Sequence, residues 1–266
     1  MFAAQARSHY MNLLILVGLG LFSGLLAGIL GIGGGTVLVP IIKSLGYTPV
    51  QAVATSSLAI IMTSFSGSLQ NWRAGNLNLR RVVLLGLPSL LTAQLGVKLA
   101  SEIAPHILLT SFASFLLFNI FLSQLRKKVV SKGDRQEQLL DNPLLARLFT
   151  GGTAGFLAGL FGIGGGVILV PLQMVLLGEK IKTAIQTSLG VIVITSISAC
   201  IGHASRGNIL WMPGIILGSG GLIGAQISTR FLPKLPDKFV VTSFNVLLGL
   251  LSAYIFYQAY LLFNSP

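Results

Sequence analysis

Two short glycine runs, residues 31–35 and 162–166, are the segments of this chain best suited to bind a ligand. Both read Gly-Ile-Gly-Gly-Gly within strongly apolar sequence, and glycine is among the poorest helix formers. Unwound backbone in a membrane is tolerated only where protein or a water-filled cavity meets it. Such a turn exposes backbone N–H groups, and a helix that begins after it adds a positive dipole end, so the runs predict an anion site without charged side chains. The residues concerned are Gly31, Gly33, Gly34, Gly35, Gly162, Gly164, Gly165 and Gly166.

Close packing of helices is the alternative interpretation of these glycines, because small residues let helix backbones approach each other in membranes. For the isolated pair Gly24 and Gly28 we favour packing. For the triple glycines, which occur twice in the same context, we favour a binding site. Pro40 and Pro171 follow the two runs at the same distance and are expected to break or bend the arm that returns from each run.

Polar side chains recur at matched positions in the apolar segments that follow each run. The predicted substrate-binding hydroxyl and amide groups belong to Thr55, Ser56, Gln94, Thr187, Ser188 and Gln226. Neutral donors of this kind suit an oxyanion that must also be released. Alternatively, the hydroxyls bond to their own helix or pack between helices, and the glutamines bridge helices. Because polar groups at bilayer depth are costly, we expect both glutamines to face the interior of the bundle.

The distribution of titratable residues argues against other chemistries. All six acidic residues lie in expected loops or at helix ends, whereas a cation site or proton relay usually needs a carboxylate inside the membrane. The sequence has no phosphate-binding loop for ATP. Its three histidines are widely separated and it has one cysteine, so we expect no metal, no cofactor and no enzyme activity. His203, at the end of an apolar segment, is expected to be solvated.

Composition places these groups in a membrane protein. Of the 266 residues, 53% are hydrophobic and only 9% are charged, whereas soluble domains carry roughly 25% charged residues. The net charge of +12 fits Lys and Arg retained in cytoplasmic loops better than nucleic-acid binding. We therefore expect an all-α polytopic membrane protein whose partners are the lipid bilayer and a small anionic substrate, with no nucleic acid.

The elements that must position the site form an internal repeat. Residues 24–40 recur almost letter for letter as residues 155–171, and matched pairs continue for over a hundred residues. We divide the chain into a first transmembrane repeat (11–125), a basic linker (126–147) and a second repeat (148–263). Each repeat is expected to hold a glycine-broken first segment, as a hairpin or a discontinuous helix, and three further transmembrane helices, each close to the ~20 residues that a span needs.

The distribution of Lys and Arg favours the hairpin and an inverted repeat. If each glycine segment enters and turns back, one side of the membrane collects all 18 Lys and Arg except Arg7, Lys43, Lys98 and Arg206. A single crossing gives a more even partition. By the positive-inside rule, the hairpin arrangement predicts a cytoplasmic linker, both termini outside and halves of opposite orientation. Broken spanning helices remain the alternative.

The duplicated G-x-x-A-G-x-x-G-I-G-G-G-x-x-x-V-P segments at 24–40 and 155–171 resemble those of the sulfite exporter TauE/SafE transporters. The Thr-Ser helices that follow and the basic central loop extend the resemblance over about residues 13–262. It implies a bacterial inner-membrane transporter of sulfite, sulfoacetate or related organosulfonates. The family motif maps here to the eight glycines of the two runs and to Pro40 and Pro171.

An anion exporter is the leading functional hypothesis. A passive channel or importer of the same anions is the first alternative, since direction depends on gradients and gating. A structural subunit, in which the glycines serve only packing, is another. Apolar faces could meet lipid or a second copy, which leaves a homodimer open.

Overall fold

Apolar segments separated by glycine and short polar turns fold into a helical bundle, for which the computed structural model describes residues 2–130 and 142–264. All regular structure in these residues is helical. The elements are α1 (Phe2–Leu30), α2 (Gly35–Ser44), α3 (Pro49–Arg73), α4 (Leu79–Glu102), α5 (Pro105–Val130), α6 (Pro143–Phe161), α7 (Gly166–Leu176), α8 (Ile181–Ala204), α9 (Trp211–Phe231), a 3-10 turn (Leu232–Lys234) and α10 (Asp237–Asn264).

Within the described residues, 8 helices are long and apolar enough to cross a membrane. The two remaining helices, α2 with 10 residues and α7 with 11, are too short to cross and each follows a glycine run. The expected all-α polytopic membrane protein is therefore confirmed. Each half of the described chain contains a long helix, a glycine break, a short helix and three further long helices.

Local sequence explains where the helices begin. The Thr48 and Asn78 side chains accept hydrogen bonds from Gln51 N and Arg81 N at the starts of α3 and α4. Asn142 caps α6 in the same way, with Pro143 in the first turn. A proline is tolerated there because the first N–H groups of a helix have no intrahelical acceptor.

Glycine stripes bring helices of the two halves into backbone contact. A Cβ added to Gly20 or Gly24 of α1 would overlap the carbonyl oxygen of Leu217 or Gly221 on α9. On α6, Gly151, Gly155 and Gly159 meet carbonyl oxygens of α4 in the same way. These contacts confirm that Gly24 serves helix packing. They also make the two halves one packed body.

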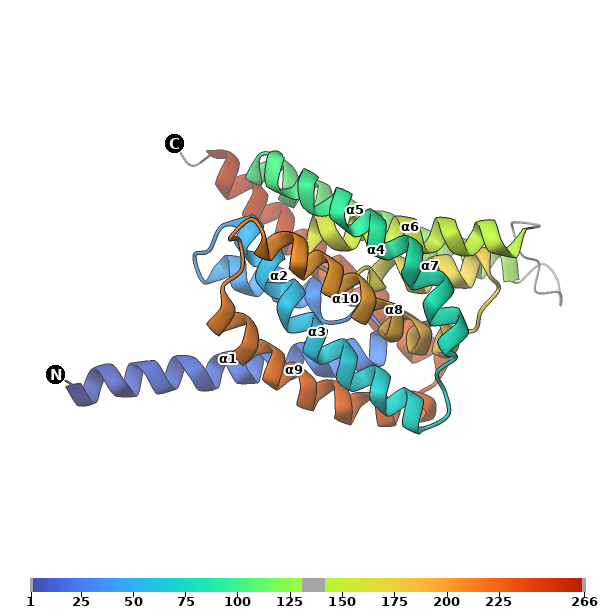
Figure 1. Ribbon diagram of the computed structural model, residues 1–266, viewed down its shortest axis with the longest axis horizontal. Helices are drawn as coiled ribbons and strands as arrows, with labels where there is room; N and C mark the ends of the chain where they lie inside the picture. The colour runs from blue at the N-terminus through green and yellow to red at the C-terminus, as the bar shows by residue number, and fades with distance from the viewer. Residues whose placement is uncertain (1, 131–141, 265–266) are drawn as a thin grey trace.

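The contacts fix the direction of each helix. In four helix pairs, the residue numbers of the contacting positions increase together along both helices, so the two helices of each pair are parallel. These pairs are α1 with α9, α3 with α9, α6 with α4 and α8 with α4. Because α1 and α3 share one direction, the chain must turn back through α2 between them, and α7 turns back likewise between α6 and α8. α4 follows α3 in the opposite direction, so α6 runs opposite to α1 (Figure 1).

The loops with most of the basic residues lie at one end of the bundle, and both chain termini lie at the other (Figure 1). At the basic end, Lys182 at the start of α8 pairs with Asp237 at the start of α10, 3.6 Å apart. The helices also take in both ends of the expected linker, because α5 extends to Val130 and α6 begins at Pro143. The middle of that linker, 131–141, lies outside the described residues.

Candidate functional site

The two glycine breaks meet at the centre of the bundle, where residues 31–40 and 161–170 are all buried. A Cβ added to Gly35 would lie 2.5 Å from Gly162 O and 2.7 Å from Ile163 Cα. Reciprocally, a Cβ on Gly166 would overlap the Gly31 carbonyl oxygen and lie 2.8 Å from Ile32 Cα. The structure therefore brings the two predicted glycine runs together, with backbone contact between the halves at Gly35 with Gly162 and at Gly166 with Gly31.

Both breaks have the same backbone conformation. Gly31, Gly33 and Gly34 have φ of 70°, 69° and 86°, and their counterparts Gly162, Gly164 and Gly165 have φ of 65°, 69° and 81°. Residues with a Cβ rarely adopt this left-handed region, so glycine is required at these positions. Pro40 and Pro171, which were expected to break or bend the returning arms, do not end these helices. α2 and α7 continue as helix through Pro40 and Pro171, so the glycines and not the prolines interrupt the chain.

Hydroxyl groups bind the carbonyl oxygens of the breaks. Ser23 Oγ donates to Gly34 O at 2.9 Å. Ser56 Oγ donates to Gly162 O of the opposite break at 2.6 Å. Thr195 Oγ1 lies 3.0 Å from Gly164 O. Ser56, which the sequence predicts as a substrate donor, contacts the backbone of the site.

Most backbone N–H groups of the breaks, in contrast to these carbonyl oxygens, have no hydrogen-bond partner. The Gly31 N–H donates to Ala27 O at 2.8 Å and ends α1 in the ordinary way. Within the described chain, no hydrogen bond is formed by the next three N–H groups, of residues 32–34, or by those of residues 163–165. Buried N–H groups without an acceptor are rare in native proteins. With several carbonyls occupied by hydroxyls, each break presents a run of unpaired donors.

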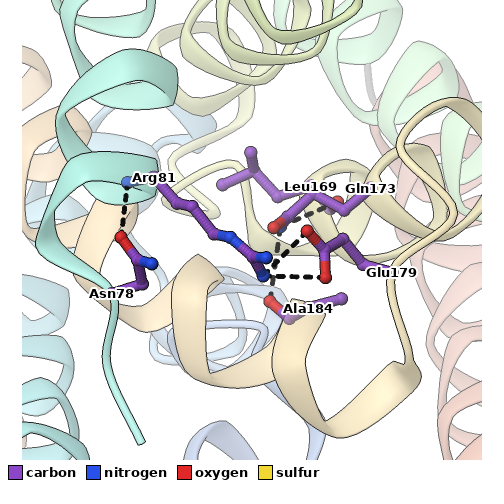
Figure 2. Close-up of polar contacts among 6 residues, drawn as sticks. All are labelled: Asn78, Arg81, Leu169, Gln173, Glu179 and Ala184. Carbon is purple, nitrogen blue, oxygen red and sulfur yellow. Dashed lines mark hydrogen bonds and ion pairs between the residues drawn. The ribbon is translucent and has the colours of Figure 1, made fainter. Parts of the chain in front are cut away.

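The second break has an extra clamp that the first lacks. Gln173 Nε2 on α7 lies 3.2 Å from Leu169 O and 3.3 Å from Ala184 O (Figure 2). It also lies 3.1 Å from Ser188 Oγ, so Gln173 ties α7 to α8. The predicted donor Ser188 is therefore occupied by Gln173 and by its own helix at Ala184 O.

An ion pair extends this clamp to α4. Glu179, in the loop after α7, donates its N–H to Gln173 O at 3.1 Å. Its carboxylate lies 2.8 Å from Arg81 Nη1 at the start of α4 (Figure 2). The loop that leads from α7 into α8 is thus held by both halves of the chain.

The other predicted hydroxyls and the amides lie further from the breaks. Thr55 Oγ1 accepts from Leu210 N at 3.0 Å, at the start of α9, and Thr187 is buried beside Ser188. Gln94 Nε2 binds Ser198 O on α8 at 2.6 Å. Its counterpart Gln226 accepts from Ser66 Oγ on α3 at 3.0 Å. The two glutamines therefore bridge helices in matching fashion.

Two expectations from the sequence are corrected. Gln94 is exposed and Gln226 half-buried, so neither lies in the bundle interior, because each reaches across a helix pair near its outer edge. His203, expected to be solvated, is 0% exposed. Its Nε2 lies 3.2 Å from Gly159 O, because α8 packs against α6 at this position. Among residues 2–130 and 142–264, no group of three or more His, Cys, Asp and Glu could hold a metal ion.

The supporting residues missed at the sequence level are Ser23 and Gln173. Neither has a polar counterpart in the other half, where Ala154 and Ile42 take their places. A search for matched polar pairs therefore passes over both. The one available signal is position along the chain, because Gln173 lies two residues after Pro171 in the segment that follows the second glycine run.

Ser56 offers a direct test of how the hydroxyls hold the breaks. We expect Ser56→Ala to lower the free energy of unfolding by about 1–2 kcal/mol, because it leaves the buried Gly162 carbonyl without its donor. Ser57→Ala is the matched control, since Ser57 Oγ donates only to Val53 O of its own helix. Chemical unfolding in detergent measures both. Equal losses for the two variants would contradict a role for Ser56 at the break.

Comparison with known proteins agrees with the membrane fold. The family model for the sulfite exporter TauE/SafE matches residues 16–255. The probable membrane transporter protein YunE of Bacillus subtilis is 26% identical over 269 residues, which cover 93% of this chain and 98% of that protein. YjnA of the same organism is 29% identical over 87% of this chain and 96% of its own. The probable membrane transporter protein MJ0441 of Methanocaldococcus jannaschii is 29% identical over 71% of each chain. The chain is therefore a multi-pass membrane protein that belongs to the sulfite exporter TauE/SafE family of transporters.

Proposed function

We propose that this protein exports small sulfur-containing anions, such as sulfite or an organosulfonate, and holds them at the paired glycine breaks. The observation that carries this proposal is the run of buried N–H groups without acceptors at residues 32–34 and 163–165. An unpaired buried N–H costs about 1–3 kcal/mol. An oxyanion that enters the site would supply the missing acceptors.

The arrangement of charge favours an anion over a cation. Helices α2 and α7 begin directly after the breaks, so their positive dipole ends face the same region as the free N–H groups. Hydroxyls of Ser23, Ser56 and Thr195 occupy carbonyl oxygens that would otherwise repel an anion. The site thus consists of neutral donors, which bind an oxyanion without a permanent ion pair and allow release. Such a site binds and transports its ligand without catalysing a reaction on it.

The membrane potential would provide the driving force for export. The basic end, which bears the central linker, faces the cytoplasm by the positive-inside rule, and both termini face outward. An inside-negative potential moves an anion outward with ~2.3 kcal/mol per charge per 100 mV. Export from a bacterial inner membrane therefore needs no coupling ion. Apolar side chains exposed on α4, α5, α9 and α10 fit contact with the lipid bilayer, and a homodimer would bury part of the same surface.

Sulfite efflux from proteoliposomes tests this function. We expect efflux to rise with an imposed inside-negative potential, and purified protein to gain thermal stability with sulfite in proportion to ln(1 + [L]/Kd). Gly34→Ala is expected to abolish both effects, because a Cβ at φ 86° strains the break that aligns the N–H groups.

Gly46→Ala is the matched control for this variant. Gly46 also has a positive φ, 94°, but a Cβ there meets nothing within 4 Å. Both variants therefore carry backbone strain of about 1–2 kcal/mol, and only Gly34→Ala should lose anion binding. Efflux that ignores the potential would contradict electrogenic export, because passive movement of an anion, through a channel as through an exporter, carries charge and follows the potential. No stabilisation of the folded wild type by sulfite, sulfate or sulfoacetate would contradict the anion site.

A further inference from the structure

The two breaks differ in the residue that directly follows the triple glycine. The first break continues with Thr36 and the second with Val167. Both side chains are buried, with exposures of 0%. Val167 packs in the main hydrophobic core. Thr36 Oγ1 has no hydrogen-bond partner in the described structure.

A buried threonine hydroxyl without a partner points to a missing ligand. Burying such a group unpaired is unfavourable, and threonine in a helix commonly donates to a carbonyl one turn earlier, which Thr36 does not do. Thr36 lies in the first turn of α2, where Cα–Cβ bonds tilt toward the helix N-terminus. Its hydroxyl is thus directed toward the N-terminal end of α2, which follows directly on the unpaired N–H groups of residues 32–34.

The second break is built as a fixed support. Gln173 contacts Leu169 O and Ala184 O, and the Arg81–Glu179 ion pair holds the following loop (Figure 2). A further contact with Ser188 Oγ ties α7 to α8. In the first half, the position two residues after the proline is Ile42, which is buried and apolar. Therefore α2, which carries the unpaired Thr36 hydroxyl, lacks the side-chain hydrogen bonds that tie α7 to α8.

We infer that the two breaks are not equivalent: the first holds the anion, with the Thr36 hydroxyl donating to one of its oxygens, and the second supports it. This inference rests on the proposed function and names the subsite within it. The ligand class is a small oxyanion with several acceptor oxygens, which can meet the Thr36 hydroxyl and neighbouring N–H groups together. Zwitterionic taurine, whose ammonium group would meet only donors, should bind more weakly.

The test exchanges the two side chains, since valine and threonine have nearly the same shape. Thermal unfolding of the wild type, Thr36→Val, Val167→Thr and the double variant is measured with increasing sulfite or sulfoacetate. We expect Thr36→Val to weaken the apparent affinity about tenfold or more, as for loss of a hydrogen bond to a charged group. Without anion, its melting temperature should equal or exceed that of the wild type, because an unpaired buried hydroxyl has been removed.

The double variant distinguishes the two breaks. If the inference is correct, a threonine at position 167 does not restore the affinity lost by Thr36→Val, and Val167→Thr alone changes affinity less than about twofold. Full affinity in Thr36→Val, or rescue by Val167→Thr, overturns the inference while anion binding by the wild type upholds the proposed function. Absence of binding in the folded wild type overturns both.

Discussion

Gly35→Ala and Gly166→Ala are each expected to lower the free energy of unfolding by about 3 kcal/mol, the upper range for overpacking a filled core. A Cβ on Gly35 would lie 2.4 Å from Ile60 Cδ1, 2.5 Å from Gly162 O and 2.7 Å from Ile163 Cα, so backbone must move as well as the Ile60 side chain. Gly166 meets the backbone of Gly31 and Ile32 in the same way. At roughly 2–4 °C per kcal/mol for a chain of this size, the melting temperature in detergent should fall by about 10 °C.

Gly18→Ala provides the control for these two variants. Gly18 is an exposed glycine of α1, and a Cβ there meets nothing within 4 Å. Alanine is the better helix former by about 1 kcal/mol, so this variant should be neutral or slightly stabilising. Wild-type stability in Gly35→Ala would mean that the two breaks do not lie in contact in the membrane.

Packing and ligand binding, the two interpretations of the glycine runs, are compatible in this arrangement. The helical glycines Gly35 and Gly166 provide the close approach of the two halves. Gly33 and Gly34, with positive φ, turn the chain so that consecutive N–H groups find no acceptor. Division of roles within one run explains why both properties occur in the same five residues. It also means that variants must be chosen by position to separate stability from binding.

Sequence alone was sufficient to predict the elements of this fold. Apolar stretches of about 20 residues identify spans because each must cross the hydrocarbon core. The glycine runs predict breaks, since glycine disfavours helix and Gly31 and Gly162 need a backbone conformation that other residues avoid. The charge partition favoured a chain that turns back at each break, and the parallel directions of α1 and α3 agree with that path.

The helix neighbours could not be predicted, for a physical reason. Lipid tails are as apolar as leucine, so hydrophobicity does not say which helix face meets protein. The burial of His203 depends on the packing of α8 against α6, where its ring meets Gly159 O, a contact between distant parts of the chain. Ser23 binds the first break across a turn that only the folded backbone creates. The glycine stripes of α1 and α6 were the available signal for packing, although they do not name the partner helix.

Gly155→Ala should destabilise the bundle by about 3 kcal/mol or more, because it separates α6 from α4 along their whole contact. A Cβ on Gly155 would overlap the carbonyl oxygen and Cα of Ser89, where two helix backbones touch. Gly152→Ala is a matched control one turn away on the same helix, since a Cβ there lies 3.7 Å from Thr92 Cγ2, an ordinary contact. Chemical unfolding of both variants in detergent measures the difference.

The consequences of Gly155→Ala should also reach the anion site. α6 ends at Phe161, directly before the second break, and Gly162 accepts the Ser56 hydroxyl from the opposite half. A helix displaced from α4 would move that carbonyl, so sulfite-induced stabilisation should fall along with the melting temperature. In Gly152→Ala both should remain at wild-type values. Loss of stability with undiminished anion binding would show that the second break moves independently of its helix, and would contradict its role as a fixed support.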